Sequence, residues 1–518
     1  MPSGGPVAAG PEHPGAAIPA DTVCWRRFHA FDSPLPTTSS ADPALGRALL
    51  EHPHILPLAL IGWHLLFWVL APLLAYGMAP LDAIELLGWG MEWQGGYYKH
   101  PPLGPWLGEI AFQLSGGRIG SLYVLAQLGM AATLAYVWLT ARLVLDPARA
   151  ALATAVLAGS YFHTVLTPNF NMNTLQLPLW VALGYHVLRG LRGARWHWVA
   201  AGAAAALLLL AKYSGALLVA VCGLLVLCLP EGRRALREAW PQVLLGIALG
   251  LALLSPHLLW LSSHWRLPLE YLGSFDFQSR PGWQAHVLGP LRFGLVSLAS
   301  PLFAYVLFAL VLDRRVPRPR IDRDTWVLLA LLLGPLLLAM AWGAFSGSRL
   351  KTTWAFPFFS LAGVVLFRLL PTRVDARAMQ RFAIGLALVT LFIAGVHLAY
   401  KTGSERSKTR FDGPGLALAV QAHWDQAFDT PLRIVAADHI LSAMVSQYAP
   451  DRPSMLVHGD FTVSTWLTPA QLQRDGAAVL CRGEFACLRP IAGEDREPIV
   501  LEVDGERFSL FLRPPAGD

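Results

Sequence analysis

The sequence predicts a polytopic α-helical membrane protein with a small α/β domain at its C-terminus. Hydrophobic residues fill 54% of its 518 positions and charged residues only 14%, with a mean hydropathy of +0.46. A soluble domain carries about 25% charged residues, so too little polar surface remains here to cover a soluble core of this size. Long apolar runs recur along the chain, and a charged, turn-rich stretch follows the last of them.

The first 52 residues precede the first long apolar run and are rich in proline, glycine and alanine. They lack the apolar core of a cleavable signal peptide. We therefore expect residues 1–52 to form a flexible cytoplasmic leader, and the first span to act as an uncleaved anchor.

Apolar runs predict about eleven membrane spans, with thirteen as the upper count, in a transmembrane region over residues 53–401. A crossing takes about 20 apolar residues, and roughly 17 is the lower limit. The runs lie near residues 55–78, 121–145, 147–166, 172–190, 195–212, 213–230, 240–262, 286–312, 325–346, 351–370 and 380–400. The least certain division is at Lys212-Tyr213-Ser214-Gly215.

The basic residues alternate between the loops, as the enrichment of lysine and arginine in cytoplasmic loops requires. With the N-terminus inside, the inner loops hold 17 arginines. The outer connections hold seven cations, which are Lys99, Arg118, Lys212, Arg266, Arg280, Arg349 and Lys351. The net charge of +6 therefore reports topology, and no nucleic acid partner is needed to explain it.

An odd number of spans places residues 402–518 on the outer side as a small α/β domain. Its predicted strands are 432–436 and 455–458, followed by a hairpin of 500–503 and 507–511 around Asp504-Gly505. Cys481 and Cys487 lie in this domain, where a disulfide is one reading because oxidation is allowed outside the cytoplasm. Cys222 and Cys228 fall in a span and read as packing residues.

The first outer loop, residues 79–120, is too long for a connector and too apolar for a simple surface loop. It predicts two short amphipathic helices on the outer face of the membrane, with Leu86, Trp89 and Trp93 at helical spacing. Asp82 and Glu85 share one face of the first helix. Their spacing before an apolar run also fits a capping box, so capping and a role in a cavity both stay open for Asp82.

The stretch Tyr97-Tyr98-Lys99-His100-Pro101-Pro102 predicts a rigid, cationic and aromatic corner at the membrane surface. The two prolines restrict the backbone, and they favour an extended conformation at His100. A phosphate group suits such a corner because it accepts charge-assisted hydrogen bonds. The alternative is a surface turn with a lysine that reaches toward water.

These residues resemble the bacterial GT-C glycosyltransferases, the relatives of protein O-mannosyltransferases and of the lipid A aminoarabinose transferase. The stretch from Asp82-x-x-Glu85 to Tyr97-Tyr98-Lys99-His100-Pro101-Pro102-Leu103 is most similar to the branch with rhizobial lipopolysaccharide galacturonosyltransferases. The resemblance covers about residues 55–500. Shorter matches follow in order at Pro168-Asn169-Phe170-Asn171-Met172-Asn173, Ala211-Lys212-Tyr213, Ser255-Pro256-His257 and Gly347-Ser348-Arg349-Leu350-Lys351-Thr352-Thr353-Trp354.

The resemblance implies an inverting transfer of a monosaccharide from a polyprenyl-phosphate donor on the periplasmic side of the bacterial inner membrane. Asp82, with Glu85 beside it, would be the base or the carboxylate that orients the acceptor. The acceptor would be a lipid or glycan of the envelope, with lipid A or the lipopolysaccharide core favoured. The aminoarabinose transferases have Glu-Lys-Pro-Pro where this chain has Lys99-His100-Pro101-Pro102. The missing glutamate puts a divalent metal cofactor in doubt.

The remaining candidates lie at the outer ends of the spans. Lys99, His100, Lys212, Arg349 and Lys351 are candidates for binding the donor phosphate. The candidates for substrate contacts are Tyr97, Tyr98, Tyr213, Asn171, Asn173 and His257. Each has a plainer alternative: anchoring or reaching toward water for the cations, loop capping for the asparagines, and a buried hydrogen bond for His257. Asp438 and His439 follow a strand in the outer domain, where contact with an acceptor is a weaker hypothesis.

Two other classes compete with a lipid-linked glycosyltransferase. A transporter or flippase of a lipid-linked sugar would show related halves and ionisable residues near the membrane midplane, whereas the candidates here gather at the outer ends. An oligosaccharide ligase or polymerase shares the chemistry and would need a larger cavity. The sequence has no Walker motif and no Gly-x-Gly-x-x-Gly after a strand, so no motif for nucleotide use is present. It also has no His-Glu-x-x-His of a zinc protease and no Gly-x-Ser-x-Gly of a serine hydrolase.

Overall fold

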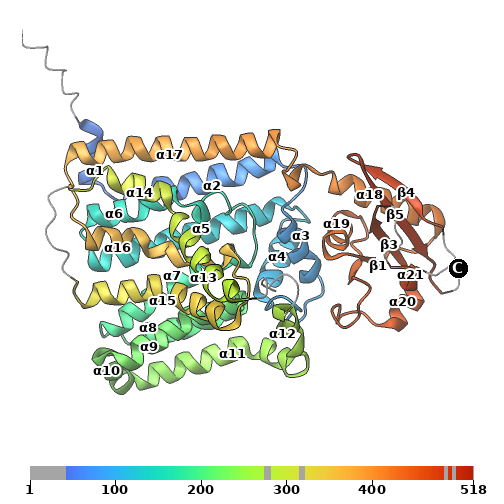
Figure 1. The fold of residues 1–518 in the computed structure, drawn as a ribbon, viewed down its shortest axis with the longest axis horizontal. Coiled ribbons are helices and arrows are strands. Elements are labelled where there is room, and N and C mark those ends of the chain that lie inside the picture. The colour runs from blue at the N-terminus through green and yellow to red at the C-terminus, as the bar shows by residue number, and fades with distance from the viewer. Residues whose placement is uncertain (1–42, 274–281, 314–320, 484–487, 493–496, 517–518) are drawn as a thin grey trace, which may run out of the picture. The chain divides into compact units, whose positions relative to one another are not determined.

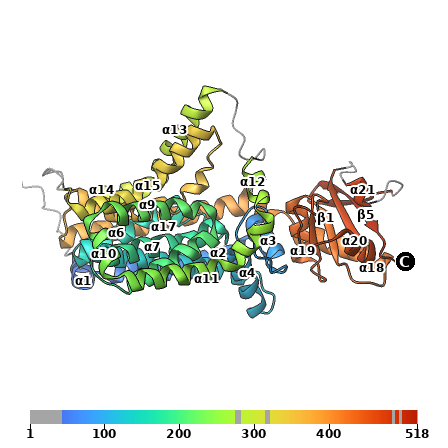
Figure 2. The same ribbon diagram turned by 90° about the horizontal axis from the view of Figure 1, so that it is seen from below.

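The computed structural model describes residues 43–273, 282–313, 321–483, 488–492 and 497–516. Figure 1 shows long helices side by side and a sheet domain beyond their ends, with α3 and α4 between the two. Figure 2 gives the same arrangement after a 90° turn. The predicted class, a polytopic helical protein with a C-terminal α/β domain, is confirmed.

Six segments of the described chain are long and apolar enough to cross a membrane. They are α2 (Ile55–Ala75), α5 (Gly120–Val144), α11 (Trp240–His264), α15 (Arg323–Ser346), α17 (Ala376–Gly403) and the segment Thr352–Leu369, which contains η4 (Thr352–Ala355), η5 (Phe358–Leu361) and α16 (Ala362–Leu369). The number rises to eight if each bent pair is one span; these pairs are Tyr213–Cys228 with Pro230–Glu238, and Trp283–Ala299 with Leu302–Ala309. The pairs comprise η3 (Tyr213–Gly215), α9 (Ala216–Cys228), α10 (Pro230–Glu238), α13 (Trp283–Ala299) and α14 (Leu302–Ala309).

Three of the predicted spans fall on segments that are not, by themselves, long and apolar enough to cross a membrane. They are α6 (Pro147–Ala155) with η1 (Val156–Gly159) and η2 (Tyr161–His163), α7 (Met172–Leu191), and α8 (His197–Ala211). The first is broken into short turns, α7 carries polar residues, and α8 is too short. The total of eleven spans therefore stays a prediction.

Part of the predicted flexible leader is helical. Residues 1–42 lie outside the described chain, but Ala44–Glu51 form α1, which packs on α17. Leu49 is buried in this contact. Gly46 permits the close approach, because an added Cβ atom would lie 1.7 Å from the carbonyl oxygen of Ala376. Residues 44–51 are therefore not part of a flexible segment.

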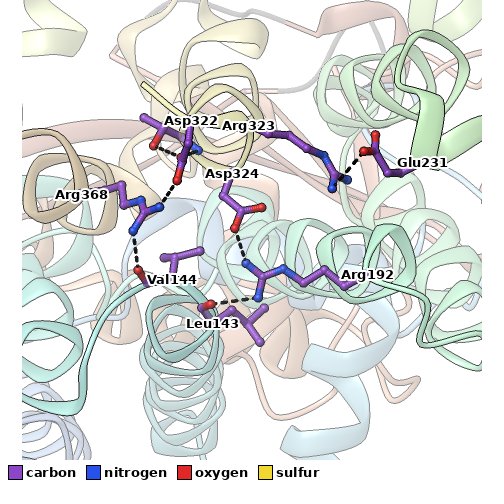
Figure 3. A network of polar contacts seen from close by, with 9 residues as sticks. Leu143, Val144, Arg192, Glu231, Asp322, Arg323, Asp324 and Arg368 are labelled. Atoms are coloured by element: carbon purple, nitrogen blue, oxygen red, sulfur yellow. Dashed lines mark hydrogen bonds and ion pairs between the residues drawn. The ribbon is translucent and has the colours of Figure 1, made fainter. Parts of the chain in front are cut away.

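The ends of the helices opposite the sheet domain are joined by ion pairs (Figure 3). Arg192 pairs with Asp324 at 2.6 Å and Arg323 with Glu231 at 3.3 Å, while Arg368 pairs with Asp322. Arg192 and Arg368 also donate to the carbonyl groups that end α5, as Figure 3 shows. The charge pattern places all three arginines on one side of the membrane. They lie at the ends of α7, α15 and α16, and the structure brings these helix ends together at one end of the bundle.

The first outer loop contains the two predicted helices, α3 (Leu81–Gly90) and α4 (Leu103–Leu114). The sequence places α3 on the membrane surface, but the structure buries every residue of its Ala83–Gly90 portion. Trp89 is 1% exposed and stacks on Tyr97 with ring centroids 5.5 Å apart. The side chains of Leu86, Trp89 and Tyr97 therefore belong to a protein core that the C-terminal domain covers, whereas Trp93, beyond the end of α3, is 47% exposed.

The C-terminal domain is a five-stranded mixed sheet in the order β2-β1-β3-β5-β4. Its strands are β1 (Ile434–Ala437), β2 (Ser454–Val457), β3 (Ala477–Arg482), β4 (Ile499–Val503) and β5 (Glu506–Arg513). Strand β1 lies parallel to β2 and β3, while β5 lies antiparallel to β3 and β4. The helices are α18 (Gly413–Ala427), α19 (His439–Tyr448), α20 (Pro469–Asp475) and α21 (Arg489–Ala492). The predicted strands and hairpin are confirmed, and Cys487 of the predicted disulfide lies outside the described residues.

One hydrophobic core joins the first outer loop to the C-terminal domain. Ile84 and Leu87 of α3 pack in the same cluster as Leu441 and Val445 of α19. The approach is close, because an added Cβ at Gly88 would lie 2.6 Å from the side chain of Met455. The C-terminal domain is therefore fixed to the loop that carries Asp82.

Candidate functional site

A cavity of about 640 Å³ lies where the outer loop, the helix ends and the C-terminal domain meet. Its polar lining includes Asp82, Glu85, Lys99, His100, Asn169, Asn171, Asn173, Lys212, Lys351 and His439. Its apolar lining includes Leu217 of α9, Tyr271 of α12 (Arg266–Gly273), and Ala339 and Trp342 of α15. Most of the predicted polar candidates therefore surround one space.

Asp82 is an exposed carboxylate on the cavity wall, and it does not cap its helix. Helix α3 begins at Leu81, with Pro80 in the N-cap position and no side-chain capping bond. Instead, Oδ2 of Asp82 accepts hydrogen bonds from Nδ2 of Asn169 at 3.0 Å and of Asn171 at 2.8 Å. Two amides thus orient the carboxylate toward the cavity.

Buried hydrogen bonds hold the segment that supplies these amides. Asn171 caps α7, because its Oδ1 accepts from the backbone amides of Asn173 and Thr174. Upstream, the ring nitrogens of His163 contact the hydroxyl groups of Ser160 and Ser360, both at 2.9 Å. Asn171 therefore caps α7 as predicted and also contacts Asp82.

Glu85 and Lys99 form a buried ion pair at the cavity wall. Their charged atoms lie 2.6 Å apart, and each side chain is 10% exposed. The ammonium group of Lys99 also lies 5.2 Å from the ring centroid of Tyr98 and 5.8 Å from those of Trp89 and Tyr271. Such contacts stabilise a cation at low exposure. The sequence alone gives Lys99 to the donor phosphate, but the structure gives it a carboxylate partner as well.

We expect Lys99→Met to destabilise the protein by about 3–5 kcal/mol, because it removes the cation next to a buried carboxylate. The double variant Glu85→Gln/Lys99→Met should be less destabilised than the sum of the two single variants. Thermal denaturation of the four purified proteins in one detergent measures this coupling. Additive losses would show that the pair contributes no coupling energy.

Lys212 and Lys351 supply further positive charge. The Lys212 side chain is buried, and its ammonium group donates to Oδ1 of Asn173 at 2.5 Å. Lys212 also lies near enough to Asp82 and Lys351 to interact with both electrostatically. Arg349, two residues before Lys351, is exposed and does not line the cavity. Of the two phosphate-binding candidates in this loop, Lys351 therefore lines the cavity and Arg349 does not.

His100 lies among the lysines. Burial, followed by the charges of three neighbouring ammonium groups, holds the pKa of His100 well below its ordinary value. These groups belong to Lys212, Lys99 and Lys351. The imidazole is therefore neutral near pH 7, where it can donate a hydrogen bond but adds no charge. The positive charge available to an anion comes from the lysines.

Of the four aromatic residues predicted to contact substrate, one lines the cavity and three lie outside its lining. Tyr213 lines the cavity. The hydroxyl of Tyr97 donates to the carbonyl of Trp89 at 2.7 Å, and a ring nitrogen of His257 contacts the carbonyl of Gly95 at 2.8 Å. Tyr98 packs by Lys99. Tyr97, Tyr98 and His257 are outside the cavity lining and hold the loop between α3 and α4, so their contact with substrate stays a prediction.

The described residues do not form a metal site of three or more histidine, cysteine, aspartate or glutamate side chains. The stretch Lys99-His100-Pro101-Pro102 places the ammonium group of Lys99 at the cavity wall. An ammonium group does not bind a cation, so the cavity residues do not fit a divalent metal at this position. We derive no reaction step through a metal.

Glu92 follows α3 in the first outer loop and contacts Ser454 of the C-terminal domain. Its Oε1 atom is buried without a hydrogen-bond partner among the described residues. Burial raises the pKa of Glu92 to about 7, although a hydrogen bond with Ser454 lowers it in part. At a pH between the ordinary glutamate pKa and about 7, the folded protein therefore keeps a proton on Glu92 that the unfolded chain has released.

This pKa predicts that the contribution of Glu92 to stability falls as the pH rises. The contribution is fully present below the ordinary glutamate pKa and is lost between there and about pH 7. We expect Glu92→Gln to raise the free energy of unfolding at pH 8 by on the order of 1 kcal/mol and to flatten its decline between pH 5 and 8. Melting temperatures across this range measure the effect; an equal decline in both proteins would contradict the prediction.

The structure also adds residues that the sequence did not single out. Tyr271 of α12 and Trp342 of α15 line the cavity, and neither belongs to a sequence motif that points to a site. Arg452 of the C-terminal domain donates to both carboxylate oxygens of Glu109 on α4, at 3.1 and 3.0 Å. The two residues of this ion pair lie too far apart in the sequence for spacing to reveal it. Only the folded chain brings them together.

The comparisons with known proteins agree with this architecture. The sequence model of a family described as dolichyl-phosphate-mannose-protein mannosyltransferase matches residues 99–260. No curated protein matches the chain. The crystal structure of ArnT from Cupriavidus metallidurans bound to undecaprenyl phosphate has 14% sequence identity and a TM-score of 0.57, covering 89% of this chain and 98% of ArnT. The apo structure of the same protein has 15% identity, a TM-score of 0.55 and the same coverage.

The chain therefore shares its fold with ArnT. The family match covers the end of the first outer loop and the spans through α11, the part that supplies most lysines and asparagines of the cavity. The rhizobial galacturonosyltransferase branch stays a prediction.

Proposed function

We propose that the protein is a glycosyltransferase of the bacterial inner membrane, which transfers one monosaccharide from a polyprenyl-phosphate donor to an envelope acceptor on the periplasmic side. The observation that supports it most is the cavity, where the exposed carboxylate of Asp82 lies near the cation Lys212. The fold shared with ArnT, whose structure contains undecaprenyl phosphate, is the second support.

The cavity lining offers a residue for each chemical step of the proposed transfer. The hydroxyl of the acceptor attacks the anomeric carbon of the sugar as Asp82 takes the hydroxyl proton. The bond between that carbon and the phosphate oxygen breaks, and polyprenyl phosphate leaves with one more negative charge. Lys212 and Lys351, with a hydrogen bond from His100, stabilise that charge. A single displacement of this kind inverts the configuration of the sugar.

The apolar part of the cavity suits the prenyl chain. Leu217 of α9 and Trp342 of α15 lie near the ends of membrane-crossing segments, so the cavity reaches the level of the lipid. Apart from Glu85 in the middle of α3, the charged residues of the lining lie at helix ends or in the loops between helices. This placement favours a transferase over a transporter, which would need ionisable groups near the midplane. Lipid A or the lipopolysaccharide core is the acceptor we favour.

Mass spectrometry of the envelope glycolipids from a deletion strain tests the proposal. We expect the loss of one monosaccharide, which the wild-type gene restores and the Asp82→Asn variant does not. The purified protein should then transfer that sugar from its polyprenyl-phosphate form. An unchanged glycolipid profile, together with no transfer in vitro, would contradict the proposed function.

A further inference from the structure

The C-terminal domain contributes directly to the cavity wall. His439 and Ile440, in the first turn of α19, line the same space as Asp82. Asp438 does not line it, and its carboxylate instead caps α19 by accepting from the backbone amides of Ile440 and Leu441. Of the two residues proposed to contact an acceptor, only His439 therefore lines the cavity, while Asp438 caps the helix.

A second imidazole lies beside the first. His439 follows β1 and His458 follows the parallel strand β2, and their ring centroids are 6.0 Å apart. Ligands of open α/β sheets bind outside the carboxyl ends of parallel strands, which is where both imidazoles lie. The pair thus has the position expected of a ligand-binding edge.

The backbone at His458 is held in an unfavourable conformation. Its φ angle is +54°, in the left-handed region that residues other than glycine seldom adopt. Its amide donates to the carbonyl of Ala437 at 2.7 Å, which ties the residue to the end of β1. Such strained residues cluster at binding sites, where the surrounding structure maintains them.

This edge is fixed relative to Asp82. Helix α19 packs on α3 in the shared core, and both views show the two helices side by side (Figures 1 and 2). The hydroxyl of Tyr448, at the end of α19, accepts from the backbone amide of Ala79 at 2.8 Å. The ion pair of Arg452 with Glu109 adds a second connection. The imidazoles therefore keep their place near the carboxylate.

We propose that His439 and His458 bind the acceptor, and that they recognise a hydroxyl-bearing glycolipid headgroup as it presents one hydroxyl to Asp82. This inference rests on the proposed function and assigns the acceptor side of its site. Each imidazole can donate and accept a hydrogen bond, which suits sugar hydroxyls. The lysines of the cavity serve the donor phosphate, so donor and acceptor use different residues. The proposed function favours lipid A or the lipopolysaccharide core, and a hydroxyl-bearing headgroup of this kind is the acceptor that the two imidazoles would bind.

Binding of two probes to the full-length protein in nanodiscs tests this division. Lipid A is the acceptor probe and undecaprenyl phosphate is the donor probe. We expect His439→Ala/His458→Ala to weaken lipid A binding at least tenfold and to leave undecaprenyl phosphate binding within twofold of wild type. His439→Gln, which keeps a donor and an acceptor, should retain more lipid A binding than His439→Ala. The control is His423→Ala on α18, an imidazole of the same domain outside the cavity lining.

The outcomes separate the inference from the proposed function. Equal lipid A affinity in wild type and the double variant would overturn the role of the imidazoles. A wild-type protein that binds undecaprenyl phosphate but not lipid A would overturn the glycolipid acceptor, and a peptide would then be the alternative. A wild-type protein that does not bind undecaprenyl phosphate would contradict the proposed function itself.

Discussion

Asp82→Asn is expected to lower the rate of sugar transfer by about 10²- to 10⁴-fold, the range that a positioned general base contributes. The variant should fold normally, because the Asp82 side chain is exposed to the cavity and does not cap α3. The amide keeps the size of the carboxylate but cannot take the proton of the acceptor. The measurement is the transfer rate of purified protein with saturating donor and acceptor.

The control for this variant is Glu502→Gln, which neutralises an exposed carboxylate on β4, in the C-terminal sheet. It should transfer at the wild-type rate. Asn171→Ala should give an intermediate loss, because it removes one of the two amides that orient Asp82. A wild-type rate for Asp82→Asn would remove this carboxylate from the reaction.

Lys351→Gln is expected to weaken the binding of undecaprenyl phosphate by about tenfold to a hundredfold. A hydrogen bond to a charged group contributes about 1.5–3 kcal/mol, and 1.4 kcal/mol is tenfold in affinity. Arg349→Gln removes the same unit of charge two residues away, outside the cavity, and should change the affinity less than threefold. Titration of both variants at one salt concentration measures the difference.

The comparison of these two variants separates a local contact from general attraction. Equal losses in both would show that the outer surface attracts the phosphate through its overall charge, and that Lys351 has no special contact. Raising the salt concentration should then abolish the effect of both substitutions, since exposed charges are screened. A cavity contact should keep most of its effect in high salt.

Periodicity and charge predicted the fold class because both act over long stretches of sequence. The apolar runs and alternating arginines located the helical segments, and the Asp504-Gly505 turn located the last hairpin. Strand β3 was not predicted, because it is a short apolar run without alternation. The burial of Trp89 was also missed, since a helix that packs under a domain has the same apolar pattern as one that packs on lipid.

The sequence predicted which residues line the cavity better than it predicted the hydrogen bonds and ion pairs that these residues form. The order of Asp82, Lys99, Asn171, Lys212 and Lys351 along the chain was visible, and all five line one space. The contact of Asp82 with its two asparagines was not visible, because spacing favoured a cap. The pairing of Lys99 with Glu85 joins two parts of one loop, and the place of His439 in the cavity lining depends on the contact of the C-terminal domain with that loop. Such contacts leave no periodic signal.

The double use of α3 has a consequence for how the protein is made. One side of this helix carries Asp82 to the cavity, while Ile84 and Leu87 are buried under a domain that begins after the last span. The chain is synthesised from its N-terminus, so α3 leaves the ribosome early and its covering arrives last. A nascent chain that stops after α17 would have its spans but leave α3 uncovered. The proposed activity therefore requires the residues after α17, because they cover the helix that carries Asp82.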